Sequence, residues 1–200
     1  MIRHHVRKTS YKPHTAPLLS ALLLSLVCVQ AGWAQSSTAT SPTPASTITS
    51  DSSKLAHADS AFLKDAVEGG LGEIEAGKVA VNKAVSPEVK TFAQQMVDEH
   101  TKANADLVAL ATSKGVKVPT EPSLADKAKL KILDMRDNAS FDKHYVKSQV
   151  DAHEDAIKLF QKVIKNGKDS DVQALATKTL PTLQHHLQEA KDLKIKTDGK

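Results

Sequence analysis

The sequence predicts an all-α protein: a ferritin-like four-helix bundle made of two antiparallel helical hairpins, with a long helical crossover between the second and third long helices. Three observations lead to this prediction. Four long segments repeat apolar side chains at intervals of three and four residues, as amphipathic helices do. Short connections join the first segment to the second and the third to the fourth. The connection between the second and third is about 25 residues long, enough to run the length of a bundle.

The first hairpin is expected between residues 59 and 114. Asp59 or Ser60 can cap a helix that runs to about residue 84. The Ser-Pro-Glu motif at residues 86–88 then supplies a capping serine, a proline at the first helical position and an acid in the first turn. Gly115 is expected to end this second helix.

The crossover carries a short helix of its own. Ser123 and Asp126 form a capping pair at its start, and we expect it to end near residue 136.

The second hairpin follows the crossover. Its first helix is expected over residues 140–166, with Gly167 as the stop. Asp169 or Ser170 can cap the last helix, which reaches about residue 193. Pro181 lies inside this helix and predicts a kink.

The remaining segments have the composition of targeting and linking sequences. Residues 1–34 are predicted to be a secretory signal peptide, because basic residues, a short apolar run and small residues at a cleavage position follow one another. The apolar run of about 12 residues is too short to span a bilayer. Residues 35–56, rich in Ser, Thr and Pro, are expected to be a disordered linker. The helical domain is assigned to residues 57–195 and a tail to residues 196–200.

The charge of the chain excludes several classes of function. The 27 Lys and Arg residues exceed the 23 Asp and Glu residues by four, and the predicted signal peptide holds four basic residues and no acid. The remaining chain is therefore neutral, without a basic surface for nucleic acid or anionic lipid. Cys28, the single cysteine, would leave with the signal peptide, which excludes disulfides, thiolate catalysis and Cys-ligated metals.

Each long helix turns one metal-binding side chain toward the predicted core. On helical wheels, Glu73, His100, His153 and His186 lie among the apolar residues of their helices. Counted from the turn of each hairpin at about 1.5 Å per residue, the two members of each hairpin come to similar depths. The four side chains are therefore expected to form one layer near the middle of the bundle.

Three interpretations of this layer are open. Three imidazoles and one carboxylate are a suitable ligand set for one Zn, Fe, Mn, Ni or Cu ion, with Asn104 and Gln149 one helical turn away to orient the ligands. The alternative is a hydrogen-bond network between Glu73 and the histidines, in a non-catalytic structural or interaction protein. A dinuclear redox enzyme is the third, but the residue three positions before each histidine is apolar, whereas a dinuclear carboxylate centre needs a glutamate there.

Four blocks of the sequence, between about residues 59 and 193, carry a family resemblance. They are FLKDAVEGGLGEIEAGKVA, VKTFAQQMVDEHTKAN, FDKHYVKSQVDAHEDAIKLF and LATKTLPTLQHHLQEAKDL. They resemble the bacterial family called domain of unknown function four-one-four-two. The resemblance implies an exported protein of ferritin-like fold, with no established activity. The family pattern includes Glu73, His100, His153 and the His186-Leu187 pair.

The sequence thus predicts an exported helical protein that binds one metal ion in its core, with metal handling or stress protection in the cell envelope as the expected role. We expect a periplasmic location, with the outer membrane or the exterior as alternatives. No catalytic residue and no transmembrane segment in the mature chain are predicted. Evenly polar outer faces predict a monomer or weak oligomer and identify no protein partner.

Overall fold

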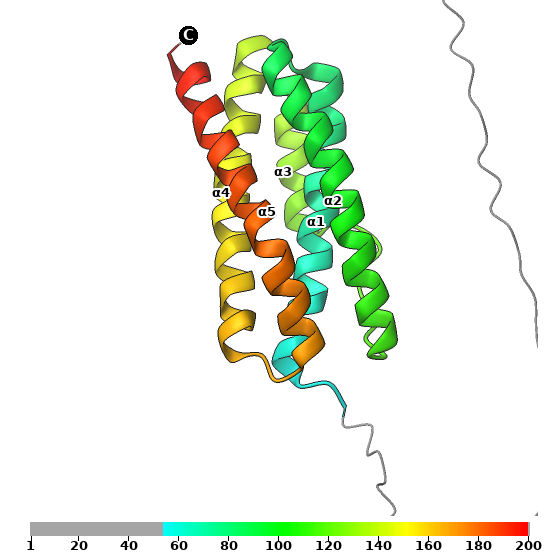
Figure 1. Cartoon of the computed structure of the whole chain (residues 1–200). Helices are drawn as coiled ribbons and strands as arrows, with labels where there is room; N and C mark the ends of the chain where they lie inside the picture. Colours follow the sequence, from blue (N-terminus) through cyan, green and yellow to red (C-terminus); the bar gives the residue numbers. More distant parts are fainter. Residues whose placement is uncertain (1–53, 200) are drawn as a thin grey trace, which may run out of the picture. The chain divides into compact units, whose positions relative to one another are not determined.

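The computed structural model describes residues 54–199, and all regular structure in this part of the chain is helical (Figure 1). The helices are α1 (His57–Lys83), α2 (Pro87–Ser113), α3 (Leu124–Asp134), α4 (Asn138–Asn166) and α5 (Ser170–Asp198). The all-α prediction is therefore confirmed. The predicted signal peptide, nearly all of the predicted linker and Lys200 lie outside the described residues.

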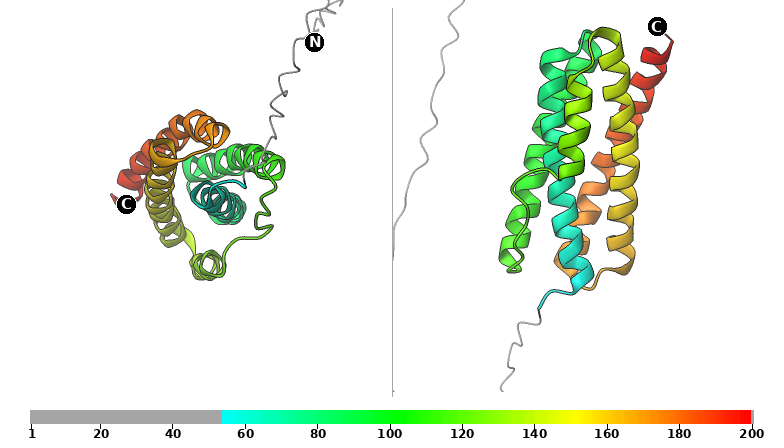
Figure 2. Two further views of the ribbon diagram at one scale, coloured as in Figure 1. Left: turned by 90° about the horizontal axis from the view of Figure 1, so that it is seen from below. Right: turned by 180° about the vertical axis from the view of Figure 1, so that it is seen from behind.

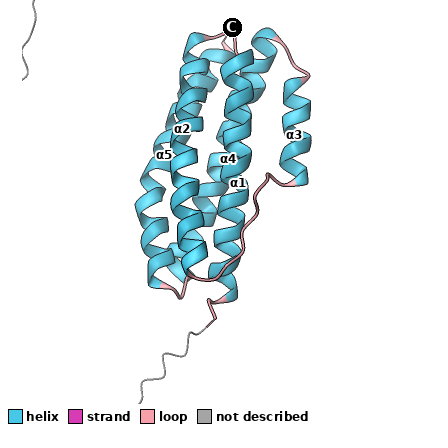
Figure 3. Ribbon diagram, turned by 90° about the vertical axis from the view of Figure 1, so that its right-hand side faces the viewer, coloured by secondary structure: helices cyan, strands magenta, loops and turns pink. Residues whose placement is uncertain are grey.

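Two antiparallel hairpins form the bundle. α1 packs along α2, α4 packs along α5, and the hairpins meet mainly through α1 and α4. After α2, residues 114–123 run back along the bundle to α3, which lies on the outside against α1 and α4 (Figures 2 and 3). This confirms the two hairpins and the helical crossover, and it is compatible with a ferritin-like topology. None of these five helices contains an apolar stretch that could cross a bilayer.

The starts of α2 and α3 follow from local sequence. Ser86 caps α2, where its Oγ accepts a hydrogen bond from the Val89 N–H at 3.5 Å, and Pro87 takes the first helical position. Ser123 caps α3 by accepting from the Asp126 N–H at 3.0 Å. Both capping predictions are confirmed, because each motif supplies an acceptor for N–H groups that the first helical turn leaves free.

The start of α5 also matches its predicted cap. The Asp169 carboxylate accepts hydrogen bonds from the N–H groups of Asp171 and Val172 at 3.0 and 3.1 Å. From there α5 continues through Pro181 to Asp198 as one helix.

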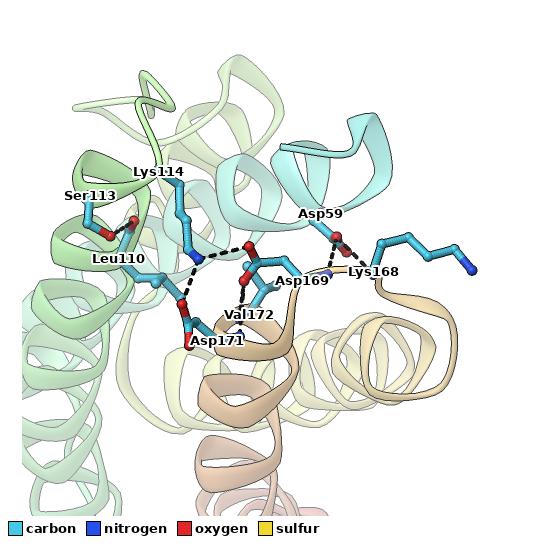
Figure 4. A network of polar contacts seen from close by, with 8 residues as sticks. All are labelled: Asp59, Leu110, Ser113, Lys114, Lys168, Asp169, Asp171 and Val172. Atoms are coloured by element: carbon cyan, nitrogen blue, oxygen red, sulfur yellow. Dashed lines mark hydrogen bonds and ion pairs between the residues drawn. The ribbon is translucent and has the colours of Figure 1, made fainter. Parts of the chain in front are cut away.

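Neither Asp59 nor Ser60 caps α1, contrary to the prediction. α1 begins two residues earlier, at His57, and its N-cap residue Ala56 makes no side-chain cap. The buried Asp59 carboxylate instead accepts hydrogen bonds from the N–H groups of Lys168 and Asp169, both at 2.9 Å, in the turn between α4 and α5 (Figure 4). These partly buried backbone donors receive their acceptor from the opposite hairpin.

A matching contact closes the other end of the bundle. Asp142, near the start of α4, is buried and accepts hydrogen bonds from the N–H groups of Val85 and Ser86 at 3.1 and 2.8 Å, in the turn between α1 and α2. The first helix of each hairpin therefore caps the turn of the other. These contacts hold the hairpins at one relative height, and with them the side chains that each hairpin carries into the core.

Ion pairs reinforce the Asp59 end. Lys114, just after α2, lies 2.8 Å from the Asp169 carboxylate and 2.6 Å from that of Asp171, as Figure 4 shows. Because these groups are partly or largely exposed, the pairs contribute less to stability than the buried caps do.

The core consists of two apolar clusters. One contains Met96 and Tyr145, and the other contains Phe62 and Phe160. Along α2, α4 and α5, the segment between the two clusters contains one buried histidine each. The histidines therefore occupy a polar layer between two apolar halves, where water is largely excluded.

We expect Asp59→Ala and Asp142→Ala each to lower the free energy of unfolding by about 1–3 kcal/mol, because each leaves two partly buried N–H groups without an acceptor. Urea unfolding followed by circular dichroism measures the loss. Asp155→Ala is the control, since Asp155 is exposed and forms a surface pair with Lys158, and it should change stability by less than about 0.5 kcal/mol. Equal effects at all three positions would contradict the role of the two buried caps.

Candidate metal centre

Three helices contribute one histidine each to the polar layer. His100 comes from α2, His153 from α4 and His186 from α5, and the three residues are 8%, 1% and 1% exposed. Each lies on the stripe that packs into the bundle: on α2, for example, Met96 and Asn104 precede and follow His100 by one turn and are also buried. Helical periodicity alone therefore brings the rings inward.

The three rings form a nearly regular triangle. Their centroids are 5.4 Å apart for His100 and His153, 5.4 Å for His100 and His186, and 5.3 Å for His153 and His186. One nitrogen from each ring lies within 4.8 Å of the other two. Among residues 54–199, these side chains form a group whose ligand atoms can hold one metal ion.

The spacing of the nitrogens agrees with a tetrahedral metal site. His153 Nε2 lies 3.3 Å from His100 Nε2 and 3.3 Å from His186 Nδ1. Two nitrogens bound to one zinc ion at about 2.0–2.1 Å, with a tetrahedral angle between the bonds, are about 3.3–3.4 Å apart. Two sides of the triangle therefore have the length that a shared ion requires, and the third nitrogen pair lies within 4.8 Å.

The outer nitrogens of two rings are already engaged. His153 Nδ1 lies 2.8 Å from the Gln149 carbonyl oxygen, and His186 Nε2 lies 2.9 Å from the Glu99 carboxylate Oε2. A carbonyl or carboxylate oxygen only accepts, so both of these ring nitrogens carry the hydrogen. In neutral rings, the lone pairs of His153 Nε2 and His186 Nδ1 then face each other across 3.3 Å. Two facing lone pairs repel unless a cation or a proton lies between them.

Burial keeps two of the rings neutral. Loss of solvent contact, with the neighbouring histidines adding to it, lowers the pKa of His100 from 6.5 to about 3. Burial likewise lowers the pKa of His153 to about 4, although the bond to the Gln149 carbonyl opposes part of the change. Neutral imidazole is the form that binds metals, so no proton has to be displaced from these two rings near pH 7.

The other predicted residues lie apart from the triangle. Glu73 is not in the group of ligand atoms within 4.8 Å, which contains histidines alone. Asn104 donates a hydrogen bond to the Val67 carbonyl at 3.1 Å and so joins α2 to α1. Gly70 makes room for it, because a Cβ at that position would lie 2.2 Å from Asn104 Oδ1. Gln149 orients His153 as expected, but through its backbone carbonyl.

Glu73 belongs to a second polar group, between α1 and α4. Its carboxyl is enclosed, and burial raises its pKa from 4.5 to about 7, opposed by the nearby Gln149 amide. The Glu73 carboxyl and the Gln149 amide are near each other but do not meet hydrogen-bond geometry. In this group, the buried polar atoms without a partner are Glu73 Oε2, both polar atoms of the Gln149 side chain and the Tyr145 hydroxyl. Unsatisfied buried groups are costly, so this cluster calls for an explanation of its own.

Glu99 contacts the triangle although its sequence position did not predict a role there. This residue stands beside His100 but points to the outer face of α2, where its side chain is 43% exposed. On a helical wheel it belongs to the solvated surface. The contact with His186 arises only because α5 packs against α2, so the sequence offered no signal for it beyond an acid adjacent to a buried histidine.

Residues 44–193 match the family model described as Domain of unknown function (DUF4142). The chain belongs to this family. The resemblance seen in the four sequence blocks is therefore confirmed. No curated protein matches the chain.

Two solved structures share the fold of this DUF4142 member. A DUF305 fragment from Deinococcus radiodurans has a TM-score of 0.64 at 9% identity, covering 71% of this chain and 98% of the fragment. A conserved hypothetical protein, rv2844, from Mycobacterium tuberculosis has a TM-score of 0.55 at 17% identity, covering 68% of this chain and 96% of its own. At these identities the likeness establishes the helical fold and nothing about the site.

The altered pKa values of His100, His153 and Glu73 predict how the free energy of unfolding depends on pH in the metal-free DUF4142 protein. Between pH 4.5 and 6.5 the unfolded chain binds protons on His100 and His153 that the folded chain lacks, because their folded pKa values lie near 3 and 4. The folded chain keeps a proton on Glu73 that the unfolded chain has lost, because its folded pKa is about 7. The unfolded state therefore binds about one more proton, and the free energy of unfolding rises with pH in this window.

Glu73→Gln removes the opposing contribution, so the rise in unfolding free energy from about pH 5 to about pH 6.5 should become roughly twice as steep. Urea unfolding at the two pH values, with a chelator present, measures this. Glu75→Gln, on the partly exposed side of α1, is the matched control and should keep the original slope. A slope that stays the same or becomes shallower in Glu73→Gln would show that Glu73 does not hold this proton.

Proposed function

We propose that the chain is a metal-binding protein that holds one transition-metal ion through His100 Nε2, His153 Nε2 and His186 Nδ1. The observation that carries the proposal is the pair of ring nitrogens on His153 and His186. Their outer partners direct both lone pairs toward each other at 3.3 Å. A metal ion accepts both lone pairs at once and turns a repulsive contact into two bonds.

Three imidazoles leave one tetrahedral position for water or another small ligand. This donor set suits Zn, Cu, Fe or Ni, and it is less suited to Mn, which prefers oxygen ligands. Glu99 supports the proposed site without binding the ion. Through its bond to Nε2 it fixes the tautomer and orientation of His186, and a carboxylate partner also makes the imidazole a better donor.

The cellular role that we propose is metal handling or stress protection in the cell envelope. The basic and apolar composition of residues 1–34 supports export, and the Ser, Thr and Pro content of residues 35–56 supports a tether between the cleavage position and the bundle. The periplasm is the proposed location, because export from a bacterial cell leads there first. Without a dinuclear ligand set in the described residues, storage or transfer of single ions fits better than oxidase chemistry.

A second candidate rests on the His186–Glu99 contact. A proton on His186 Nδ1 could replace the metal: Nε2 would donate to Glu99 at 2.9 Å and Nδ1 to His153 Nε2 at 3.3 Å. The layer would then be a hydrogen-bond network that sets helix register in a structural protein. The two functions differ in one measurable respect, since only the first binds an ion.

Titration of the tag-free, chelator-treated protein with Zn²⁺ in a calorimeter should give one site per chain. Loss of a residue that orients a metal ligand typically weakens metal binding by about 10- to 100-fold. Replacing His100, His153 or His186 by Ala removes a ligand itself and should weaken Zn²⁺ binding by more than that. His185→Ala is the matched control, because His185 neighbours His186 in sequence but its side chain is 64% exposed, and it should leave the affinity unchanged. Absence of saturable binding, or equal losses in His185→Ala and His186→Ala, would favour the hydrogen-bond network.

Glu99→Gln should weaken Zn²⁺ binding by about 10- to 100-fold while keeping the one-site stoichiometry, because the amide holds His186 less firmly and adds no charge. The same calorimetric titration measures it. Glu154→Gln serves as a control on the outer face of α4, where Glu154 pairs with Lys191. An unchanged affinity in Glu99→Gln would remove Glu99 from the proposed centre.

A further inference from the structure

A cleft of about 520 Å³ is lined mainly by α1, α3 and α4, with further residues from α2 and α5. α3 stands on the outside of the bundle (Figure 3), and its side chains form one wall of the cleft. Most of the lining is apolar and includes Leu107, Leu130, Leu133, Leu159 and Phe160. A cavity of this size is in the range of small-molecule sites in proteins.

Glu73 provides the polar group in this apolar lining. Its carboxyl is enclosed, lines the cleft and has an oxygen without a hydrogen-bond partner. No salt bridge to Glu73 is present among residues 54–199. The Gln149 side chain beside it also has free donor and acceptor atoms. An unpartnered carboxyl that faces a cavity is a ready acceptor for a ligand that donates hydrogen bonds.

The charge around the cleft favours a cation. Four aspartates line it besides Glu73: Asp65, Asp126, Asp151 and Asp155. The basic residues in the lining are Lys129 and Arg136. Lys129 is paired with Asp126 at 3.1 Å, and two lysines outside the lining, Lys147 and Lys158, are paired with Asp151 and Asp155 at 2.6 and 2.9 Å. Among residues 54–199, the charged lining groups without an ion pair are Asp65, Glu73 and Arg136. They leave a small acidic excess, and a cleft with low-dielectric walls concentrates its field, which favours cations over anions.

We infer that this cleft is a binding site for an amphipathic cation, in which an ammonium group donates hydrogen bonds to Glu73 and an apolar body packs between α1, α3 and α4. The site differs from the proposed metal centre, with which it shares one bordering residue. His100 borders the cleft, but His153 and His186 do not. The ligand would satisfy the free carboxyl oxygen with a charge-assisted hydrogen bond and cover the leucine and phenylalanine side chains.

The test compares three probes that share an eight-carbon body: n-octylammonium, octan-1-ol and octanoate, titrated calorimetrically into the full chain. The ammonium should bind at least about tenfold more tightly than either of the others, because Glu73 and its acidic surroundings favour the cation. Equal binding of octanol would show an apolar cavity without ammonium recognition. Preferred binding of octanoate, or no saturable binding of n-octylammonium, would also overturn the inference.

Three variants locate the site. Glu73→Gln should lower n-octylammonium affinity at least about tenfold, whereas Glu75→Gln should not change it. Gly69→Leu should abolish binding by filling the cleft: Gly69 lines it, a Cβ there meets no atom within 4 Å, and leucine favours helix over glycine, so this variant should fold. Unchanged affinity in Glu73→Gln or in Gly69→Leu would refute the site.

One further variant separates this inference from the metal proposal. His153→Ala should lose Zn²⁺ binding and keep n-octylammonium binding, because His153 does not border the cleft. Retained ammonium binding in a wild-type chain that fails to bind Zn²⁺ would leave the cleft assignment intact. Loss of ammonium binding in a folded His153→Ala chain would contradict the separation of the two sites.

Discussion

Two buried imidazole nitrogens that face each other with their lone pairs impose the central constraint on this structure. His153 and His186 are each tied at the outer nitrogen, one to a backbone carbonyl and one to the Glu99 carboxylate. Neither ring can turn its lone pair away without breaking the hydrogen bond at its outer nitrogen. Because the core excludes water, no solvent molecule would replace that bond. A positive charge between the rings removes the conflict, and the 3.3 Å spacing is that of two ligands on one ion.

The rest of the bundle serves to hold this arrangement at one height. Apolar clusters above and below the histidine layer supply most of the hydrophobic stabilisation and exclude water from the rings. The reciprocal contacts of Asp59 and Asp142 prevent one hairpin from sliding along the other. A shift of one helical turn, about 5.4 Å, would separate His100 from His153 and His186, since these lie on different hairpins. The two buried caps therefore act on the geometry of the site from both ends of the bundle.

Much of the fold and of the candidate site could be predicted from the sequence, because the spacing of residues along a helix determines which side chains face the core. The inward faces of α2, α4 and α5 placed three histidines correctly, and the hairpin lengths placed them at one depth. Glu73 shows the limit: it is enclosed as predicted, yet it lies between α1 and α4 with Gln149, because a helical wheel gives a direction but not the neighbour that the direction meets. Glu99 and Asp59 show the complementary limit, since both act on residues of another helix that packing alone brings near.

X-ray absorption at the zinc edge of the Zn²⁺-loaded protein measures directly whether the three histidines bind the ion. We expect three imidazole nitrogens at about 2.0–2.1 Å, with the outer-shell scattering of histidine rings, and one further light ligand. A coordination shell made of oxygen atoms without the imidazole signature would contradict this expectation, and the histidine layer would then be a hydrogen-bonded element of a helical scaffold.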